Sequence, residues 1–270
     1  MLKRRILLVF VSLALIAGLY FLPKAVVEND SQLQEAAPAT GAEATPSPHA
    51  TTPVSVRKNI NRLRARYLSN ASEQKNAIFA DSLVNLYSQA GQYDSSAWFA
   101  ERATTFLHTE ESLLKAGNAY YEAYTFAVDG DKQNALAEKA RSFYAQVLEK
   151  NPHNLAIKTK MAMTYLSSGA PMQVIAILRE VLAEDPANED ALYNMGMLSI
   201  QSGQFPKAVD WLEKLVKVNA KHLQGQLMLG VAYMNTGQKD KARQQFEQVK
   251  KMDQDPAVQA AVDSYLKDLN

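Results

Sequence analysis

The sequence repeats itself with a period of 34 residues over its C-terminal half. Three consecutive segments align without gaps: 155–188, 189–222 and 223–256. The alignment places Gly169, Gly203 and Gly237 in one column, and other small, aromatic and large apolar residues also recur in register. A period of this length is typical of a solenoid of helix–turn–helix units, in which each unit buries its apolar face against its neighbours. The repeat therefore predicts an all-α fold.

The composition excludes several kinds of chemistry. The 270 residues carry a net charge of +1 and include no cysteine. Without cysteine there can be no disulfide, thiolate metal site or cysteine nucleophile. The near-neutral charge gives no reason to expect nucleic acid as a partner. The sequence shows no Ser/His/Asp spacing and no phosphate-binding glycine loop. We therefore expect no enzyme activity, no catalytic residues, no metal and no cofactor.

Residues 6–22 form an unbroken apolar run that follows three basic residues. Continued over 6–27, this helix is long enough to cross a hydrocarbon core of ~30 Å. A cleaved signal peptide is the alternative, but its apolar region is usually only about 7–15 residues long. We expect an uncleaved transmembrane signal anchor with residues 1–5 in the cytoplasm, as the positive-inside rule requires. The rest of the chain would lie beyond the inner (cytoplasmic) membrane, in the periplasm of a Gram-negative bacterium.

Residues 28–53 have the composition of a disordered linker. They are rich in Ala, Thr, Pro and Glu and contain almost no large apolar residues. Such a segment cannot bury enough surface to offset the entropy of ordering. We expect a flexible tether between the membrane and the folded part.

A basic segment, 54–76, is expected to form a helix before the first repeat. Ile60, Leu63 and Tyr67 recur at helical spacing. Five cations lie in a stretch without any acid: Arg57, Lys58, Arg62, Arg64 and Arg66. Two interpretations stay open. The helix packs on the first repeat with a solvated basic face, or its cations contact anionic lipid headgroups near the anchor.

The repeated columns resemble those of the tetratricopeptide repeat (TPR) family. The residues that carry the resemblance are Ala162, Tyr165, Leu178 and Pro186, then Gly196, Ala208 and Leu212, and then Gly230, Tyr233, Ala242 and Phe246. The resemblance implies a right-handed α-solenoid of helix pairs, with small residues where the two helices of a unit cross. Ser199 departs from the pattern, because it stands where the family usually has an aromatic residue.

Two earlier units, 77–109 and 110–154, resemble the repeats more weakly, which makes five repeats over 77–256. The second of them holds eleven extra residues between its helices, and a longer inter-helix loop is expected there. Residues 257–270 form an apolar stripe after Asp255 and Pro256, a good helix start. They are expected to form a capping helix.

In the TPR family, the first helix of each unit lines a concave groove, which implies a partner-binding surface here. The residues at the corresponding positions are mostly apolar: Met163, Leu166, Tyr193, Asn194, Met197, Ile200, Leu227, Met228, Val231 and Met234. Methionine-rich surfaces adapt to varied apolar partners. The alternatives are that these methionines belong to the core, or that the C-terminal helix folds over them.

The family resemblance and the anchor together favour a membrane-anchored scaffold that binds a protein or peptide in its groove. Protein export or envelope assembly is the expected setting. Assembly of c-type cytochromes and self-association within a membrane complex are the alternatives, since both rest on the same fold-level analogy. The identity of the partner and the oligomeric state stay open.

Overall fold

The computed structural model describes residues 52–69 and 72–269. The chain divides into Met1–Ala50 and Thr51–Asn270, and only the second unit is described here. The expected cytoplasmic end, the membrane anchor at 6–27 and nearly all of the linker at 28–53 lie outside the described residues. Within the described ranges, no helix combines the length and apolar character needed to span a bilayer.

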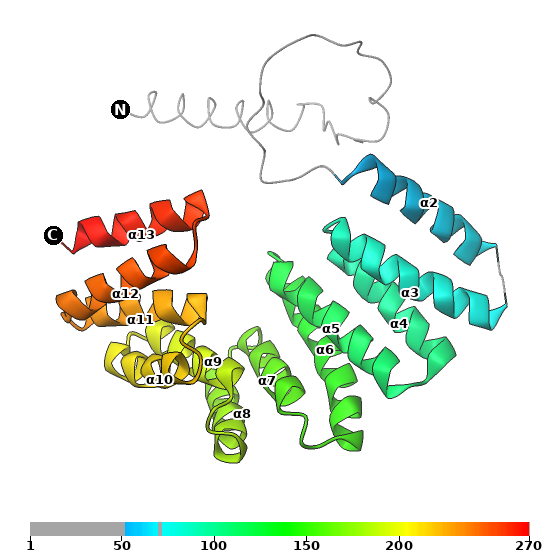
Figure 1. Ribbon diagram of the computed structural model, residues 1–270. Helices are drawn as coiled ribbons and strands as arrows, with labels where there is room; N and C mark the ends of the chain where they lie inside the picture. Colours follow the sequence, from blue (N-terminus) through cyan, green and yellow to red (C-terminus); the bar gives the residue numbers. More distant parts are fainter. Residues whose placement is uncertain (1–51, 70–71, 270) are drawn as a thin grey trace, which may run out of the picture. The chain divides into compact units, whose positions relative to one another are not determined.

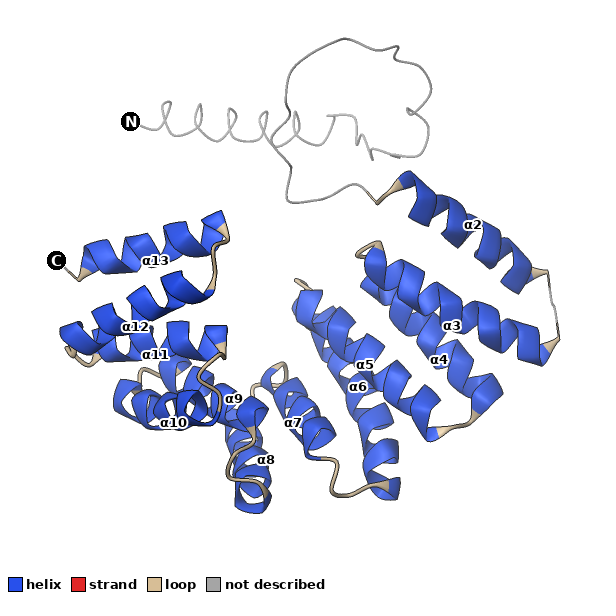
Figure 2. Cartoon of the chain, in the orientation of Figure 1, coloured by secondary structure: helices blue, strands red, loops and turns tan. Residues whose placement is uncertain are grey.

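The described part of the chain contains helices and no strands (Figures 1 and 2). In chain order they are α2 (Val54–Leu68), α3 (Glu73–Gln89), α4 (Tyr93–Leu107), α5 (Glu110–Phe126), α6 (Gly130–Lys150), α7 (Leu155–Met163), the short 3₁₀ turn η1 (Thr164–Leu166), α8 (Pro171–Glu184), α9 (Glu189–Gln201), α10 (Phe205–Val218), α11 (Leu223–Asn235), α12 (Lys239–Met252) and α13 (Pro256–Asp268). Each helix packs on the next along the chain. Five pairs, from α3/α4 to α11/α12, correspond to the five predicted repeats.

Glycine makes the turn inside four of the five pairs. Gly91, Gly169, Gly203 and Gly237 have φ between 67° and 75°, a left-handed conformation that residues with a Cβ adopt only at a cost. The three glycines that align in the sequence therefore all form the turn between the two helices of their unit. Gly91 forms the same turn in the first unit. These are the turns of the helix–turn–helix units that the repeat predicts.

A second set of glycines allows the paired helices to approach closely. A Cβ built on Gly196 would lie 2.6 Å from Leu212 Cγ, and one on Gly230 would lie 2.6 Å from Phe246 Cε1. Leu212 and Phe246 are fully buried, so neither side chain has room to move away. The crossing of α9 with α10 and of α11 with α12 thus depends on a missing side chain in the first helix and a large one in the second.

Gly230→Ala should destabilise the fold. The methyl group would displace the Phe246 ring, and overpacking of this kind costs about 1–3 kcal/mol, which exceeds the gain of up to ~1 kcal/mol from better helix propensity. We expect a lower denaturant midpoint. Gly130→Ala is the matched control, because nothing lies within 4 Å of its Cβ position, and it should be neutral or slightly stabilising. Equal effects of the two changes would contradict the close crossing.

The eleven extra residues of the second unit do not form the expected long loop. They lengthen the helices instead: α5 continues to Phe126 and α6 begins at Gly130, so only three residues separate them. Asp129 begins α6 by accepting a hydrogen bond from the backbone N–H of Lys132 at 2.8 Å. The expectation of a longer loop was wrong, because the inserted residues contain no helix breaker beyond this cap.

Contacts with the first repeat stabilise these longer helices. Phe126 stacks on Tyr93 with ring centroids 4.2 Å apart, and Lys132 forms an ion pair with Asp94. Phe126 and Lys132 both belong to the inserted residues, which an ordinary 34-residue unit lacks. The inserted residues therefore add to the interface between the first two repeats.

The two terminal helices cover the ends of the stack. Ile60 of α2 is buried, and Leu63 and Tyr67 pack beside it against the core of the first two repeats. The basic helix is shorter than the predicted 54–76, since it ends at Leu68 and α3 begins at Glu73. At the other end, Tyr265 of α13 stacks on Phe246 with centroids 5.0 Å apart.

A recurring group of three side chains joins adjacent repeats, and we call it the Tyr–Glu–Lys junction. Between the last two repeats, the Tyr233 hydroxyl donates to Glu213 Oε1 at 2.6 Å. Lys241 Nζ lies 5.1 Å from the centroid of the Tyr233 ring. Burial and then the hydrogen bond to Glu213 raise the pKa of Tyr233, so the phenol stays a donor at neutral pH.

The first two repeats are joined by the same group. Tyr120 donates to Glu101, Lys139 Nζ lies 2.7 Å from Glu101 Oε1, and the same ammonium lies 5.8 Å from the Tyr120 ring centroid. Burial acts to raise the pKa of Glu101, but hydrogen bonds from Lys139 and Tyr120 favour the carboxylate, and the net shift is downward.

This lowered pKa predicts an acid-dependent contribution to stability. A carboxylate whose folded-state pKa lies below its unfolded value near 4.5 stabilises the fold above that pH and stops doing so as the pH falls through the folded-state pKa. Glu101→Gln should therefore lower the melting temperature at pH 7, and its difference from the wild type should shrink as the pH falls below 4.5 through the folded-state pKa. The exposed Glu247 provides the control, Glu247→Gln, for loss of a surface charge. A difference that stays constant with pH would refute the assignment.

Candidate functional site

The first helices of the N-terminal units form a polar surface with a hollow of about 420 Å³. Its lining comes from α3, α5 and α7, with Ser96 of α4. Side chains on successive first helices bond to one another here: Ser88 Oγ donates across the hollow to Glu122 Oε2 at 3.0 Å, and Lys115 at its edge pairs with Asp81 outside it. Both pairs are 34 residues apart, one more than the 33 residues of the first unit, so each joins a position of α3 to the position one residue further along in α5.

Asn118 lies where three helices meet in this hollow. Its Oδ1 accepts from the Tyr144 hydroxyl at 3.1 Å and from Lys160 Nζ at 2.9 Å. Burial raises the pKa of the neighbouring Tyr121 to about 12, with smaller contributions from Tyr124 and from the charge of Asp190. The surface therefore offers neutral hydroxyl and amide groups beside fixed charges, which suits hydrogen bonding to a peptide chain.

The ten predicted groove residues lie on the first helices of the last three repeats. They are distributed as Met163 on α7, Leu166 on η1, Tyr193, Asn194, Met197 and Ile200 on α9, and Leu227, Met228, Val231 and Met234 on α11. All ten are partly buried, with none in the fully buried core and none fully exposed. Six of them pack on the core of the last two repeats. They form a half-covered apolar surface, and their role in binding stays a prediction.

The groove methionines had two alternative interpretations: they belong to the core, or the C-terminal helix covers them. The methionine of α9 that enters the core is Met195, with 5% of its surface exposed, and not Met197. The C-terminal helix α13 packs chiefly on α12, which is the second helix of its pair. Met197 and Met234 both keep part of their surface accessible, although Met234 also packs against the core of the last two repeats.

The predicted lipid-contact residues share one helix. Arg57, Lys58, Arg62, Arg64 and Arg66 all lie on α2 and are all exposed. Among the described residues none of them forms an ion pair; Arg62 donates to the side chain of Asn59 at 3.1 Å. Both α2 interpretations fit this geometry, since a helix packed through Ile60 can still present its cations to a charged surface.

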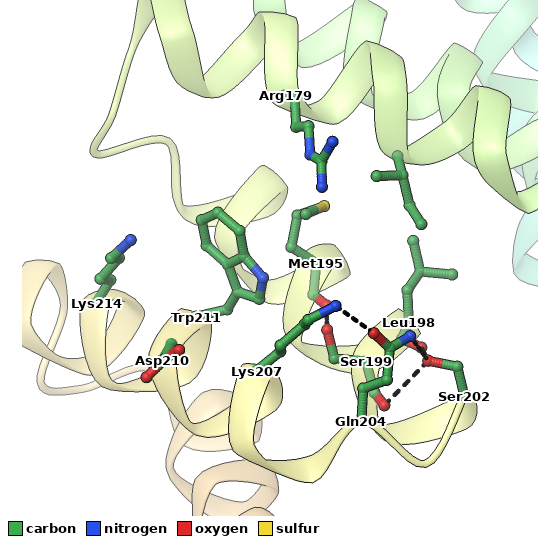
Figure 3. A pocket seen from close by; sticks show the side chains of 11 residues that line it. Arg179, Met195, Leu198, Ser199, Ser202, Gln204, Lys207, Asp210, Trp211 and Lys214 are labelled. Carbon is green, nitrogen blue, oxygen red and sulfur yellow. Dashed lines mark hydrogen bonds between the residues drawn. The ribbon is translucent and has the colours of Figure 1, made fainter.

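A second hollow, of about 290 Å³, lies between α8, α9 and α10 (Figure 3). Its lining includes Arg179, Met195, Ser199, Lys207 and Trp211. None of these belongs to the predicted groove. One feature of the sequence points to this hollow: Ser199 stands at a repeat position that is usually aromatic. Within the described residues, no group of three or more His, Cys, Asp or Glu side chains is placed to hold a metal ion.

Comparisons with known proteins agree with this architecture. A sequence model of the tetratricopeptide repeat matches residues 167–228 and 212–264, so this part of the chain consists of tetratricopeptide repeats. Among solved structures, the chain is similar to TTC0263, a thermophilic TPR protein of Thermus thermophilus. The two share 17% identity and a TM-score of 0.54, over 72% of this chain and 99% of that one.

The chain is also similar to a structure of MamA, 41-end, from Desulfovibrio magneticus RS-1. Here the identity is 16% and the TM-score 0.50, over 69% of this chain and 98% of that one. Identities this low establish a shared fold only. No curated protein sequence matches the chain. The predicted all-helical TPR solenoid is confirmed.

Proposed function

We propose that this protein is a membrane-anchored interaction scaffold that binds a protein or peptide along the first helices of its repeats. The observation that carries the proposal is the character of that face. It runs from hydrogen-bonding groups on α3, α5 and α7 to partly buried apolar side chains on α9 and α11. A surface of this kind binds by complementarity and needs no catalytic group. The TPR fold supports the proposal at the level of analogy.

The partner that suits this face is a segment with an apolar portion and a polar portion. Met197, Met228 and Met234 are unbranched and can repack around different apolar side chains. Asn118 and Lys160 supply a donor-rich end for backbone carbonyls or acids. An amphipathic helix or an extended peptide satisfies both requirements.

The setting we propose is protein export or envelope assembly. It rests on the apolar run at 6–22 and the basic residues before it, which would leave the repeats on the far side of the inner membrane. Cytochrome c assembly and self-association are the alternatives, and they are outcomes of the same experiment.

Site-specific photo-crosslinking in native membranes tests the groove. A probe at Met197 or Met234 should give adducts with exported proteins, because these side chains lie on the proposed binding face. A probe at Gln244, which is exposed on the second helix α12, is the control and should not give the same adducts. Crosslinks confined to the chain itself would reject the groove, and adducts with haem-attachment apoproteins would select cytochrome assembly.

We also propose that α2 contacts anionic lipid. Five exposed cations on one helix, each attracted by about 1 kcal/mol near an anionic surface, would bind vesicles measurably in low salt. A fragment beginning at Thr52 should co-sediment with phosphatidylglycerol vesicles and not with phosphatidylcholine vesicles. Replacing the five cations by Gln should abolish co-sedimentation without changing the circular dichroism. Equal binding to neutral vesicles, or by the five-fold variant, would reject lipid contact.

A further inference from the structure

The junction between the third and fourth repeats departs from the Tyr–Glu–Lys junction at two of its three positions. One 34-residue period before Tyr233, Glu213 and Lys241 stand Ser199, Arg179 and Lys207. Lys207 keeps the cation, Ser199 removes the aromatic ring, and Arg179 puts a second cation where the acid would be. The Tyr–Glu–Lys junction pairs one acid with one cation, whereas these three residues carry two cations and no acid.

All three of these residues line the hollow of about 290 Å³. Figure 3 shows Arg179 reaching from α8 into the space beside Met195 and Trp211. A dry cavity of about 150 Å³ accommodates benzene, so the hollow is large enough for the aromatic ring that the serine omits. Ser199 itself bonds back to its own helix, donating to Met195 O at 2.8 Å, and does not fill the space.

The walls of the hollow define what it can hold. Met195, Leu198 and Trp211 supply apolar surface. Arg179 is exposed and makes no ion pair or hydrogen bond among the described residues, whereas Lys207 Nζ donates to Gln204 Oε1 at 2.6 Å.

The charge at the mouth is positive overall. Besides Arg179 and Lys207, Lys214 lies 4.5 Å from the centroid of the Trp211 ring, and Asp210 is the one acid that lines the hollow. Three cations and one anion around an apolar floor favour a ligand that combines an aromatic ring with negative charge.

We propose that this hollow is a second binding site, which takes an aromatic side chain from an acidic segment of a partner protein. The ring occupies the space that tyrosine fills at the two Tyr–Glu–Lys junctions, and flanking carboxylates pair with Arg179 and Lys207. We infer this occupant from the two Tyr–Glu–Lys junctions, where a tyrosine ring and a glutamate carboxylate of this chain lie together in the corresponding place. The site shares no residue with the groove, so it stands whether or not the groove binds a partner.

The chain has two tryptophans, and one of them lines the site, which allows a direct test. The full-length chain in mild detergent, labelled with 5-fluorotryptophan, should give two ¹⁹F signals, which Trp98→Phe assigns. The probe is a blocked pentapeptide with Phe at its centre and Glu elsewhere. It should shift the Trp211 signal saturably and leave the Trp98 signal unchanged.

Two matched peptides separate the parts of the proposal. Replacing the Phe by Ala should abolish the shift, and replacing the four Glu by Lys should abolish it as well. Equal shifts with either peptide would overturn the proposal. So would stronger binding of adenosine monophosphate, which also joins an aromatic ring to negative charge and would indicate a nucleotide site.

Variants give the second test. Arg179→Gln should weaken the binding of the Glu/Phe peptide roughly tenfold or more, because a charge-assisted hydrogen bond is lost. The double change Ser199→Tyr with Arg179→Glu rebuilds the Tyr–Glu–Lys junction. It should raise the denaturant midpoint and abolish binding. Because this variant is expected to be more stable than the wild type, lost binding cannot be ascribed to unfolding, and retained binding would overturn the site.

Discussion

The fold depends on one contact that recurs along the chain: in three of the helix pairs a large side chain of the second helix lies over a glycine of the first helix. Leu212 over Gly196 and Phe246 over Gly230 are its clearest forms. Because the helices of a pair approach so closely there, the large side chain is fully buried, and each unit presents flat apolar surfaces to its neighbours. No unit of this kind has a sufficient core alone, so stability accumulates by stacking.

The stacking of the units also determines which side chains meet on the face formed by the first helices. The first helices of adjacent units lie close enough for side chains at neighbouring positions to pair, as Asp81 does with Lys115 and Ser88 with Glu122. These pairs are partly exposed and add little to stability, as surface ion pairs generally do. Their effect is to order the side chains of the first helices, so that the polar end of the proposed groove has a defined pattern of donors and acceptors.

The repeat architecture could be predicted from the sequence because glycine and the crossing residues act locally. A left-handed turn requires Gly203 whatever the neighbouring unit contains. The insertion in the second unit could not be predicted correctly in the same way. Whether extra residues form a loop or lengthen two helices is decided by contacts such as Phe126 on Tyr93, which join residues 33 positions apart and leave no periodic signal. The length of α5 and α6 is therefore a tertiary effect.

The hollow beside Trp211 was hidden from sequence reasoning for a related reason. Ser199 is visible as a departure from its column, but the space beside it is lined by Arg179 of α8 and Trp211 of α10, which come from other helices. The change at these two positions also costs the fold little stability. Removing the tyrosine hydroxyl and its carboxylate acceptor together leaves no buried polar group without a partner, whereas removing either alone would. The contact between the third and fourth repeats is retained by Val181, Ala191 and Leu198 in the core beneath. A junction altered at donor and acceptor together keeps the solenoid continuous while opening a charged pocket on it, which is what a binding site within a repeat array requires.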